Sequence, residues 1–327
     1  MEKLQFQDDS ELIGFEKLII SQPDDYEGSV VCTLIRLKSL QRKKMAVLHV
    51  HGFNDYFFHE ETARQFFLHH IDFYAVDVRK SGRSILPHQK MNTMRDVQEQ
   101  FDDIKKCLEI IRQLHHGPVI LFGHSLGGLI AALFAEKYKN TDLFDAVFLN
   151  SPFFEQNKDV ITRKLLIPAV ASLGKKRPHL LIPGGFSKFY GPSLHINDHG
   201  LWHYNLSWKP HVAALVNAGW VRSVYQAQKK LQAGITINVP VLLAYPKESY
   251  AGLRWNKKFM RADAVVNVKH IEKYASSINA TMEILVIKDA VHDLFLSAPE
   301  IRWKVINEII KWIDRFFPEK RNLDDKN

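Results

Sequence analysis

The stretch that most constrains this chain is ILFGHSLGGLIAALF, residues 120–134, in which a polar turn with three glycines separates two apolar runs. The first run reads as a buried strand and the second as a buried helix. Gly123 and Gly127 each stand two residues from Ser125, where a Cβ would clash in so tight a turn. A G-x-S-x-G pattern between a strand and a helix is typical of a nucleophile elbow, which holds a reactive serine exposed. The alternative is a glycine-rich turn with an idle serine.

Apolar runs alternate with helical patterns over most of the chain, which predicts an α/β fold. Strands are predicted at residues 15–20, 30–37, 45–52, 71–78, 118–123, 144–152, 239–246 and 281–287, with a turn at 22–29. Helices are predicted at residues 96–114, 125–138 and 299–317. Near-continuous apolar strands are buried on both faces, so we expect a mostly parallel central sheet flanked by helices.

Between residues 152 and 237 the alternation stops, and Pro, Gly, His and Trp become frequent. A single crossover needs far less chain, so this segment reads as an inserted, mainly helical cap with short helices near 158–173 and 210–232. We therefore predict a first core part at 1–151, the cap at 152–237 and a second core part at 238–327. The cap should lie above the carboxyl edge of the sheet, where open α/β sheets bind ligands.

The positive charge of the chain is concentrated in this cap. The net charge is +8, and residues 151–235 hold eleven Lys and Arg against three Asp and Glu, while the rest of the chain is balanced. Such a surface favours an anion, whether a lipid phosphate, a carboxylate or an acidic membrane surface. The alternative is a basic lid with no specific partner. No nucleic-acid-binding module accompanies the basic residues, so we expect no nucleic-acid partner.

A nucleophilic serine needs a base, and His292 is the candidate among the sixteen histidines. It lies in a short loop after the last predicted strand and before the final helix, where the chain order of this architecture puts the base. A solvated loop histidine is the alternative. His124, inside the elbow, is interpreted as a supporting residue.

The acid that orients the histidine is sought in the loop after the strand at 239–246. Glu248 and Asp263 are the candidates there, and Asp263 is favoured because the apolar residues after it could bury it beside the imidazole. Asp289 and Asp293 lie near His292 in sequence. Asp293 fits poorly because side chains of adjacent residues diverge.

A fourth motif is VHGFND, residues 50–55. A strand that ends in His51 and Gly52 can turn so that the backbone N–H of Phe53 points toward the serine. Together with the N–H of Leu126, it would form an oxyanion hole for the charge that develops on a tetrahedral carbonyl. An ordinary strand-end glycine is the alternative.

These motifs resemble the α/β-hydrolase superfamily over nearly the whole chain. VHGFND resembles its oxyanion strand end, and YAVDVRKSGRS resembles its Asp-Arg-Gly-x-Gly-x-Ser turn, although Lys80 and Ser81 depart from the usual Gly-His. GHSLGG and FLNSPFF resemble the monoacylglycerol lipase and lysophospholipase-like branch, which is grouped with serine aminopeptidase-type sequences. In that branch the acid lies in D-x-V-(V/L) and the base in A-x-H-(D/E), which implies Asp263 and His292 here.

The sequence thus predicts a serine hydrolase that cleaves carboxylic esters, with mono-acyl lipid-like esters as substrates and with no cofactor or metal. Apolar cap residues such as Leu165–Ile167, Trp202, Tyr204 and Trp208 are expected to wall an acyl channel. The N-terminus shows no signal-peptide pattern and the two cysteines no paired spacing, so a cytoplasmic location with free thiols is expected. An aminopeptidase or amidase with the same triad, or a non-catalytic binding protein on this fold, are the alternatives.

Overall fold

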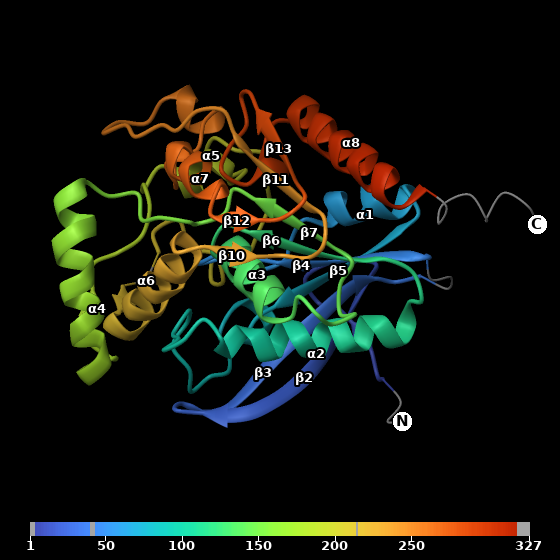
Figure 1. The fold of residues 1–327 in the computed structure, drawn as a ribbon, viewed down its shortest axis with the longest axis horizontal. Coiled ribbons are helices and arrows are strands. Elements are labelled where there is room, and N and C mark those ends of the chain that lie inside the picture. Colours follow the sequence, from blue (N-terminus) through green and yellow to red (C-terminus); the bar gives the residue numbers. More distant parts are fainter. Residues whose placement is uncertain (1–3, 40–42, 214, 319–327) are drawn as a thin grey trace, which may run out of the picture.

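The computed structural model describes residues 4–39, 43–213 and 215–318. Its centre is a nine-stranded sheet in the order β1-β2-β3-β5-β4-β6-β7-β11-β13 (Figure 1). These strands are β1 (Gln7–Asp8), β2 (Phe15–Asp25), β3 (Gly28–Leu37), β4 (Met45–Val50), β5 (Ile71–Asp77), β6 (Val119–His124), β7 (Ala146–Asn150), β11 (Val241–Pro246) and β13 (Met282–Ile287).

Every neighbouring pair from β5 to β13 is parallel, and only β1, β2 and β3 run antiparallel at one edge. The predicted mostly parallel sheet is therefore confirmed. The predicted turn at 22–29 is wrong for most of its length, because β2 and β3 continue through it to the pair Asp25–Gly28. A register shift between Gln22 and Asp25 accommodates this extension, in which polar residues lie on a solvent-exposed edge hairpin.

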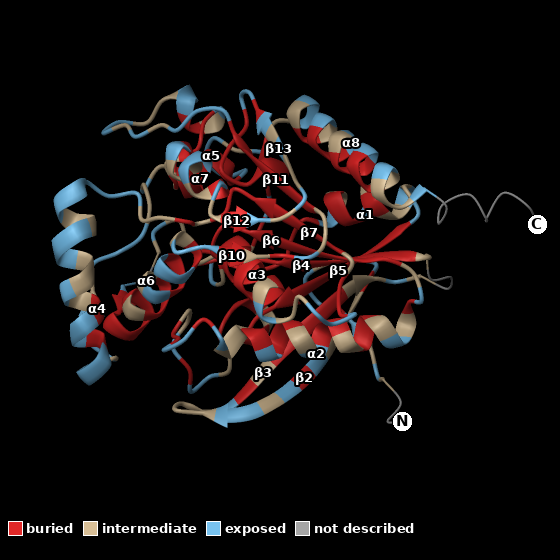
Figure 2. Ribbon diagram, in the orientation of Figure 1, coloured by how far each residue is buried: buried red, intermediate tan, exposed pale blue. Residues whose placement is uncertain are grey.

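Helices cover both faces of the sheet and form two hydrophobic layers (Figures 1 and 2). On one face lie α2 (Glu99–Leu114) and α3 (Leu126–Lys137), and on the other lie α1 (Glu60–Leu68) and α8 (Pro299–Phe316). The predicted inward face of α2 is buried at Phe101, Ile104, Leu108 and Ile111. Outside the segment 152–237, helices α1 and α7 (Val268–Ala275) were not predicted, because each is too short to display a clear periodicity.

The segment 152–237 contains few long elements. They are α4 (Ile167–Lys176), which follows a π-helical turn at Thr162–Leu166, α5 (Tyr190–Leu194), α6 (Ala218–Gln232), and the short strands β8 (Leu181–Ile182), β9 (Val216–Asn217) and β10 (Ile235–Thr236). β8 pairs with β9, and β10 pairs with β12 (Ile278–Asn279). Helices α4 and α6 pack against each other at one end of the sheet (Figure 1).

The predicted cap helices are shifted in the structure. The first ends at Lys176 rather than near residue 173. The second begins at Ala218 rather than near residue 210, because the Asn217 side chain caps it by accepting the Trp220 N–H at 2.7 Å. Residue 214, within the second predicted helix, lies outside the described residues. No helix in the described part of the chain has both the length and the apolarity needed to cross a bilayer.

Candidate active site

Ser125 lies at the carboxyl end of β6, where the strand turns directly into α3. Its φ of 54° and ψ of −116° belong to a region that residues other than glycine rarely adopt, so the turn is strained. Backbone hydrogen bonds to both the N–H and the carbonyl of Ser125 stabilise the strained turn. The Ser125 N–H donates to the Asn150 carbonyl at 3.0 Å, while the N–H groups of Gly128 and Leu129 donate to the Ser125 carbonyl. This is the conformation that the elbow motif predicts.

Two glycines let the end of β4 approach the serine. A Cβ on Gly127 would lie 2.4 Å from the Val50 carbonyl oxygen, and a Cβ on Gly52 would lie 3.0 Å from the Ser125 Cβ. Any side chain at either position would push β4 and the elbow apart. Gly123 lies within the sheet, where it pairs with Val50 of β4.

The structure brings Ser125, His292 and Asp263 together. The Ser125 hydroxyl donates to His292 Nε2 at 2.9 Å, and His292 Nδ1–H donates to Asp263 Oδ2 at 2.7 Å. All three residues are buried, and Asp263 is fully so. The other Asp263 oxygen accepts the backbone N–H groups of Val265 and Val266, each at 2.8 Å. A carboxylate held in this way can fix the imidazole tautomer that accepts a proton from serine.

The other acid candidate is placed differently. Glu248 is exposed, and its backbone carbonyl rather than its carboxylate contacts Asp263, by accepting the Asp263 N–H at 2.8 Å. In the arrangement seen here, Asp263 therefore holds the position beside the imidazole.

Phe53 and Leu126 flank the serine. Phe53 follows Gly52 in the turn after β4, and its ring packs on Trp220 with 4.8 Å between centroids. Leu126 is the first residue of α3, so its N–H is among the helix-end donors that have no partner within the helix. Both residues therefore lie next to the nucleophile, where donors to an oxyanion are required.

The two supporting histidines are buried and hydrogen-bonded to the backbone. His51 Nδ1–H donates to the Gly52 carbonyl at 2.8 Å, and its Nε2 accepts the Val78 N–H at 3.2 Å, which ties the end of β4 to β5. His124 Nδ1–H donates to the Asn150 carbonyl at 3.2 Å. Burial lowers the pKa of His124 to about 4, so its ring is uncharged at neutral pH.

Asn150, at the end of β7, joins the serine turn to the histidine loop, and sequence reasoning missed it. Its carbonyl accepts the Ser125 N–H, while its side-chain amide donates to Asp293 Oδ1 at 2.8 Å. Its side-chain oxygen accepts the Leu294 N–H at 3.4 Å. The one available signal was a polar residue at the carboxyl end of a buried strand, which is where ligand-side residues of such sheets lie.

Behind His292 lies a buried layer of further ionisable groups. Asp293 Oδ2 is 3.5 Å from His59 Nε2 and 3.9 Å from His124 Nε2. Burial opposes the charge on Asp293, but the neighbouring imidazoles and the Asn150 amide lower the pKa of its carboxyl below its ordinary value. Nearby, the Lys209 ammonium donates to Asp55 Oδ1 at 2.7 Å.

Two groups of residues bring together donor atoms suited to a metal, namely Asp55, His124 and Asp293, and His195, Asp198 and His211. In the first group, the Lys209 ammonium already neutralises Asp55. In the second, His195 Nδ1 accepts the Asn197 N–H and its Nε2–H faces the Tyr204 carbonyl. These donor sets are engaged by the protein itself, and we derive no metal-dependent step from them.

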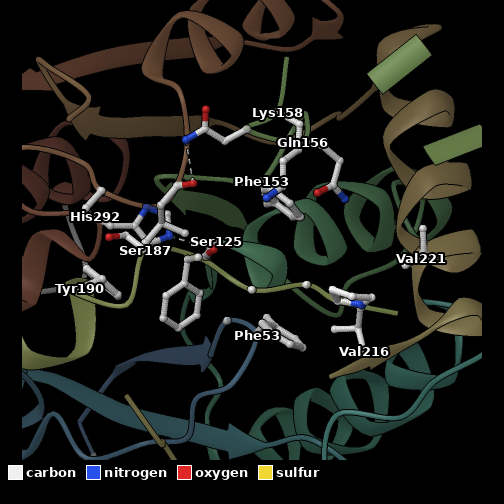
Figure 3. A pocket seen from close by; sticks show the side chains of 18 of the residues that line it. Phe53, Ser125, Phe153, Gln156, Lys158, Ser187, Tyr190, Val216, Val221 and His292 are labelled. Carbon is white, nitrogen blue, oxygen red and sulfur yellow. Dashed lines mark hydrogen bonds between the residues drawn. The ribbon is translucent and has the colours of Figure 1, made fainter. Parts of the chain in front are cut away.

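A cavity of about 850 Å³ opens beside Ser125 and His292 (Figure 3). Its apolar wall comes from α4, α6 and the β4 turn, and it includes Phe53, Leu166, Ile167, Val170, Val216, Trp220 and Val221. Of the predicted channel residues, Leu166 and Ile167 line it. The prediction is wrong for Trp202, Tyr204 and Trp208, which instead pack with Tyr56 and Phe58 in a separate hydrophobic cluster.

Comparison with known proteins gives a family match and a set of similar folds. The family model described as serine aminopeptidase, S33, matches residues 41–300. A monoacylglycerol lipase from Paleococcus ferrophilus is 20% identical, with a TM-score of 0.64, over 86% of this chain and 98% of that one. A soluble variant of monoglyceride lipase from Saccharomyces cerevisiae, in complex with a substrate analogue, is 18% identical, with a TM-score of 0.65, over 96% of each chain.

A thermophilic esterase from Thermogutta terrifontis is 18% identical, with a TM-score of 0.57, over 92% of this chain and 99% of that one. No significant match was found among curated proteins. At 18–20% identity, the similarity to these solved structures is evidence for the fold alone. It confirms the fold that the sequence predicts.

Proposed function

This chain belongs to the serine aminopeptidase S33 family of the α/β-hydrolase fold, and from that premise we propose that it is a serine hydrolase cleaving carboxylic esters. The observation that carries the proposal is the pair of hydrogen bonds joining Ser125, His292 and Asp263 at the rim of an apolar cavity. Residues that come from three separate loops meet there in the geometry that nucleophilic catalysis requires.

In the proposed reaction, Ser125 Oγ attacks the ester carbonyl while His292 Nε2 takes its proton. Asp263 stabilises the imidazolium, and the N–H groups of Phe53 and Leu126 receive the oxyanion. His292 then protonates the departing alcohol, which leaves an acyl group on Ser125. Water, deprotonated by the same histidine, releases the acid and restores the serine.

The cavity supports a mono-acyl lipid-like ester, of the lysophospholipid or monoacylglycerol type, as the substrate. Its volume of about 850 Å³ falls within the usual range for ligand sites, and side chains of α4 and α6 provide a long apolar wall. A single acyl chain could lie along this wall with its carbonyl at Ser125. Two of the solved structures with this fold are named monoacylglycerol or monoglyceride lipases and a third is named an esterase, which is consistent with the proposal.

The alternative is cleavage of an amide by an aminopeptidase with the same triad. Such an enzyme requires an acidic group to bind the free amine of its substrate. Among the described residues that line the cavity, Asp55 is the only acidic one, and Lys209 already pairs with it at 2.7 Å. This favours the ester over the amine-bearing substrate.

We also propose that residues 152–237 form a cap whose basic surface contacts anionic lipid. In support, α4 and α6, which belong to this segment, line the cavity. Residues 151–235 also contain eleven basic residues and only three acidic ones.

The direct test is a comparison of kcat/KM across p-nitrophenyl esters, monoacylglycerols, lysophospholipids and aminoacyl anilides. Ester cleavage that is lost in Ser125→Ala, with the mono-acyl lipids as the best substrates, would support the proposal. Preference for the anilides would favour the aminopeptidase alternative. If the folded protein hydrolysed none of these substrates, the alternative of a non-catalytic binding protein would be favoured.

A further inference from the structure

Exposed leucines lie on both sides of the cavity mouth. Leu166, before α4, and Leu253, in the loop after β11, both line the cavity. Leu166 is nevertheless 57% exposed to solvent and Leu253 is 97% exposed. Val160, Ile161 and Leu165 extend the apolar surface next to Leu166, each more than half exposed. Large apolar side chains exposed around an active-site opening indicate a surface that is covered in use.

The loop that carries Leu253 is also basic. The loop 251–261 belongs to the second core part, and it carries Arg254, Lys257, Lys258 and Arg261 with no acidic residue. Figure 1 shows this loop, in orange-brown, projecting on the same side of the molecule as α4. Arg254, Lys257 and Lys258 are exposed, and none of them belongs to an ion pair of the described residues.

The opposite side of the mouth has the same character. Lys158 lines the cavity, and Lys164 lies next to the exposed Leu165, and both lysines are exposed. Asp159 is the one exposed acid nearby, and it is held locally by accepting the Thr162 hydroxyl at 2.6 Å. Among the described residues, both segments that carry the exposed leucines therefore also carry exposed cations that lack an acidic partner.

The loop that carries Leu253 is anchored at its base. The Trp255 ring stacks on His199 with 3.7 Å between centroids, and Phe259 is fully buried beside Tyr250. The Asn256 side chain bonds the Tyr250 hydroxyl. An exposed leucine on a fixed base can enter an apolar phase without a large loss of conformational freedom of the loop.

We propose that this two-sided rim, made of residues 158–166 and 251–258, docks on an anionic lipid surface, with Leu253 and the leucines before α4 entering the acyl region. The inference rests on the proposed function, because the same rim would admit an acyl chain to Ser125. Cations near an anionic bilayer and apolar side chains in its interface both favour binding. The arrangement would open the cavity toward the membrane.

The test measures binding without catalysis. The Ser125→Ala protein is sedimented with vesicles of phosphatidylcholine alone and of phosphatidylcholine mixed with phosphatidylglycerol. We expect binding to the mixed vesicles that weakens as sodium chloride is added. The triple variant Arg254→Gln, Lys257→Gln, Lys258→Gln should bind about a hundredfold more weakly, because each cation contributes about fivefold. Leu253→Asn should bind about tenfold more weakly.

The matched control removes the same charge elsewhere, by Lys106→Gln, Lys304→Gln and Lys311→Gln on α2 and α8, and it should retain binding to within a fewfold. Equal loss in the control and the loop variant, or equal binding to both vesicle types, would overturn the docking surface. In the active protein, the loop triple variant should hydrolyse soluble p-nitrophenyl butyrate at the normal rate. Failure of the proposed function would instead appear as no hydrolysis by the otherwise unchanged enzyme.

Discussion

At the scale of single residues, the central feature is a pair of hydrogen bonds that joins three side chains. Ser125, His292 and Asp263 lie in a line in which each donor faces one acceptor, at 2.9 and 2.7 Å. Asp263 is further fixed by two backbone N–H groups. In the proposed mechanism Asp263 orients the imidazole, so its removal should affect turnover rather than substrate affinity.

Replacing Asp263 by Asn should lower kcat by about 10⁴, because the amide would stabilise the wrong imidazole tautomer. KM for a short p-nitrophenyl ester should change little. Glu248→Gln is the matched control, since it removes an exposed carboxylate from the same loop. Steady-state kinetics checks both variants, and collapse of kcat in the Glu248 variant alone would reverse the assignment.

His124 should make the folded protein sensitive to acid. Burial lowers its pKa to about 4 from an ordinary 6.5, so between these values the unfolded chain binds a proton that the folded protein does not. The free energy of unfolding should therefore decrease as pH falls from 6.5 toward 4, by at most about 1.4 kcal/mol per pH unit for this group.

Urea denaturation at several pH values measures this dependence. His124→Asn keeps a donor for the Asn150 carbonyl and removes the titrating ring, so its unfolding free energy should vary less with pH. An identical pH dependence in wild type and variant would contradict the prediction.

At this scale, the sequence allowed prediction of those site residues that belong to a recognisable motif. Ser125 was recognisable from its flanking glycines, and His292 from its place in chain order. It missed Asn150 and the Lys209–Asp55 pair, because these depend on which loops meet in space. Nothing in the sequence around Lys209 shows that its ammonium will be buried against a carboxylate 154 residues away.

At the scale of elements, β7 connects the Ser125 turn to the His292 loop through Asn150. Asn150→Asp would place a carboxylate against Asp293 and should lower kcat by about a hundredfold through misplacement of His292. The double variant Asn150→Asp, Asp293→Asn exchanges donor and acceptor and should recover most of the lost rate. Rate measurements on a soluble ester test this, and a double variant no better than Asn150→Asp would exclude the positioning role.

The helices α4 and α6 should set the length of the acyl chain that the enzyme accepts. Ile167→Trp would add volume inside the cavity, so cleavage of a dodecanoyl ester should fall at least about tenfold while cleavage of an acetyl ester is retained. Leu165→Trp is the matched control, because Leu165 is exposed and is not among the cavity residues. Equal effects on both esters, or in both variants, would argue against an acyl channel there.

Long, strongly patterned elements were predicted well, and short ones were not. The eight predicted strands all form, since each is a compact apolar run between turn residues. Helices α1, α5 and α7 were missed because nine, five and eight residues give too little periodicity. The start of α6 was misplaced because the apolar residues before it suggested a longer helix, whereas Asn217 caps it.

At the scale of the whole molecule, the segment 152–237 is joined to the core where the chemistry is proposed. The side-chain amide of Asn54 donates to the Pro210 carbonyl at 2.9 Å, and the Asn205 N–H donates to the Tyr56 hydroxyl at 2.7 Å. With the Lys209–Asp55 pair, these bonds fix the turn that carries Phe53. The segment 152–237 thus helps to shape the turn after β4 as well as the cavity.

The fold class was predictable because it follows from the order of buried strands and from one strained turn. The cavity was not, since its walls come from α4, α6 and the loop 251–253, whose spacing depends on how the cap packs. The same holds for the basic loop 251–261, whose first residues, 251–253, line the same cavity as Leu166 and Ile167 of an earlier part of the chain.

The central claim is that Ser125 forms a covalent acyl-enzyme. The most direct measurement is intact-protein mass spectrometry after reaction with a fluorophosphonate probe, followed by mapping of the labelled peptide. The account predicts one adduct per chain, on the peptide containing Ser125, and no adduct in Ser125→Ala. An unlabelled wild type, or a variant that labels as well as wild type, would contradict it.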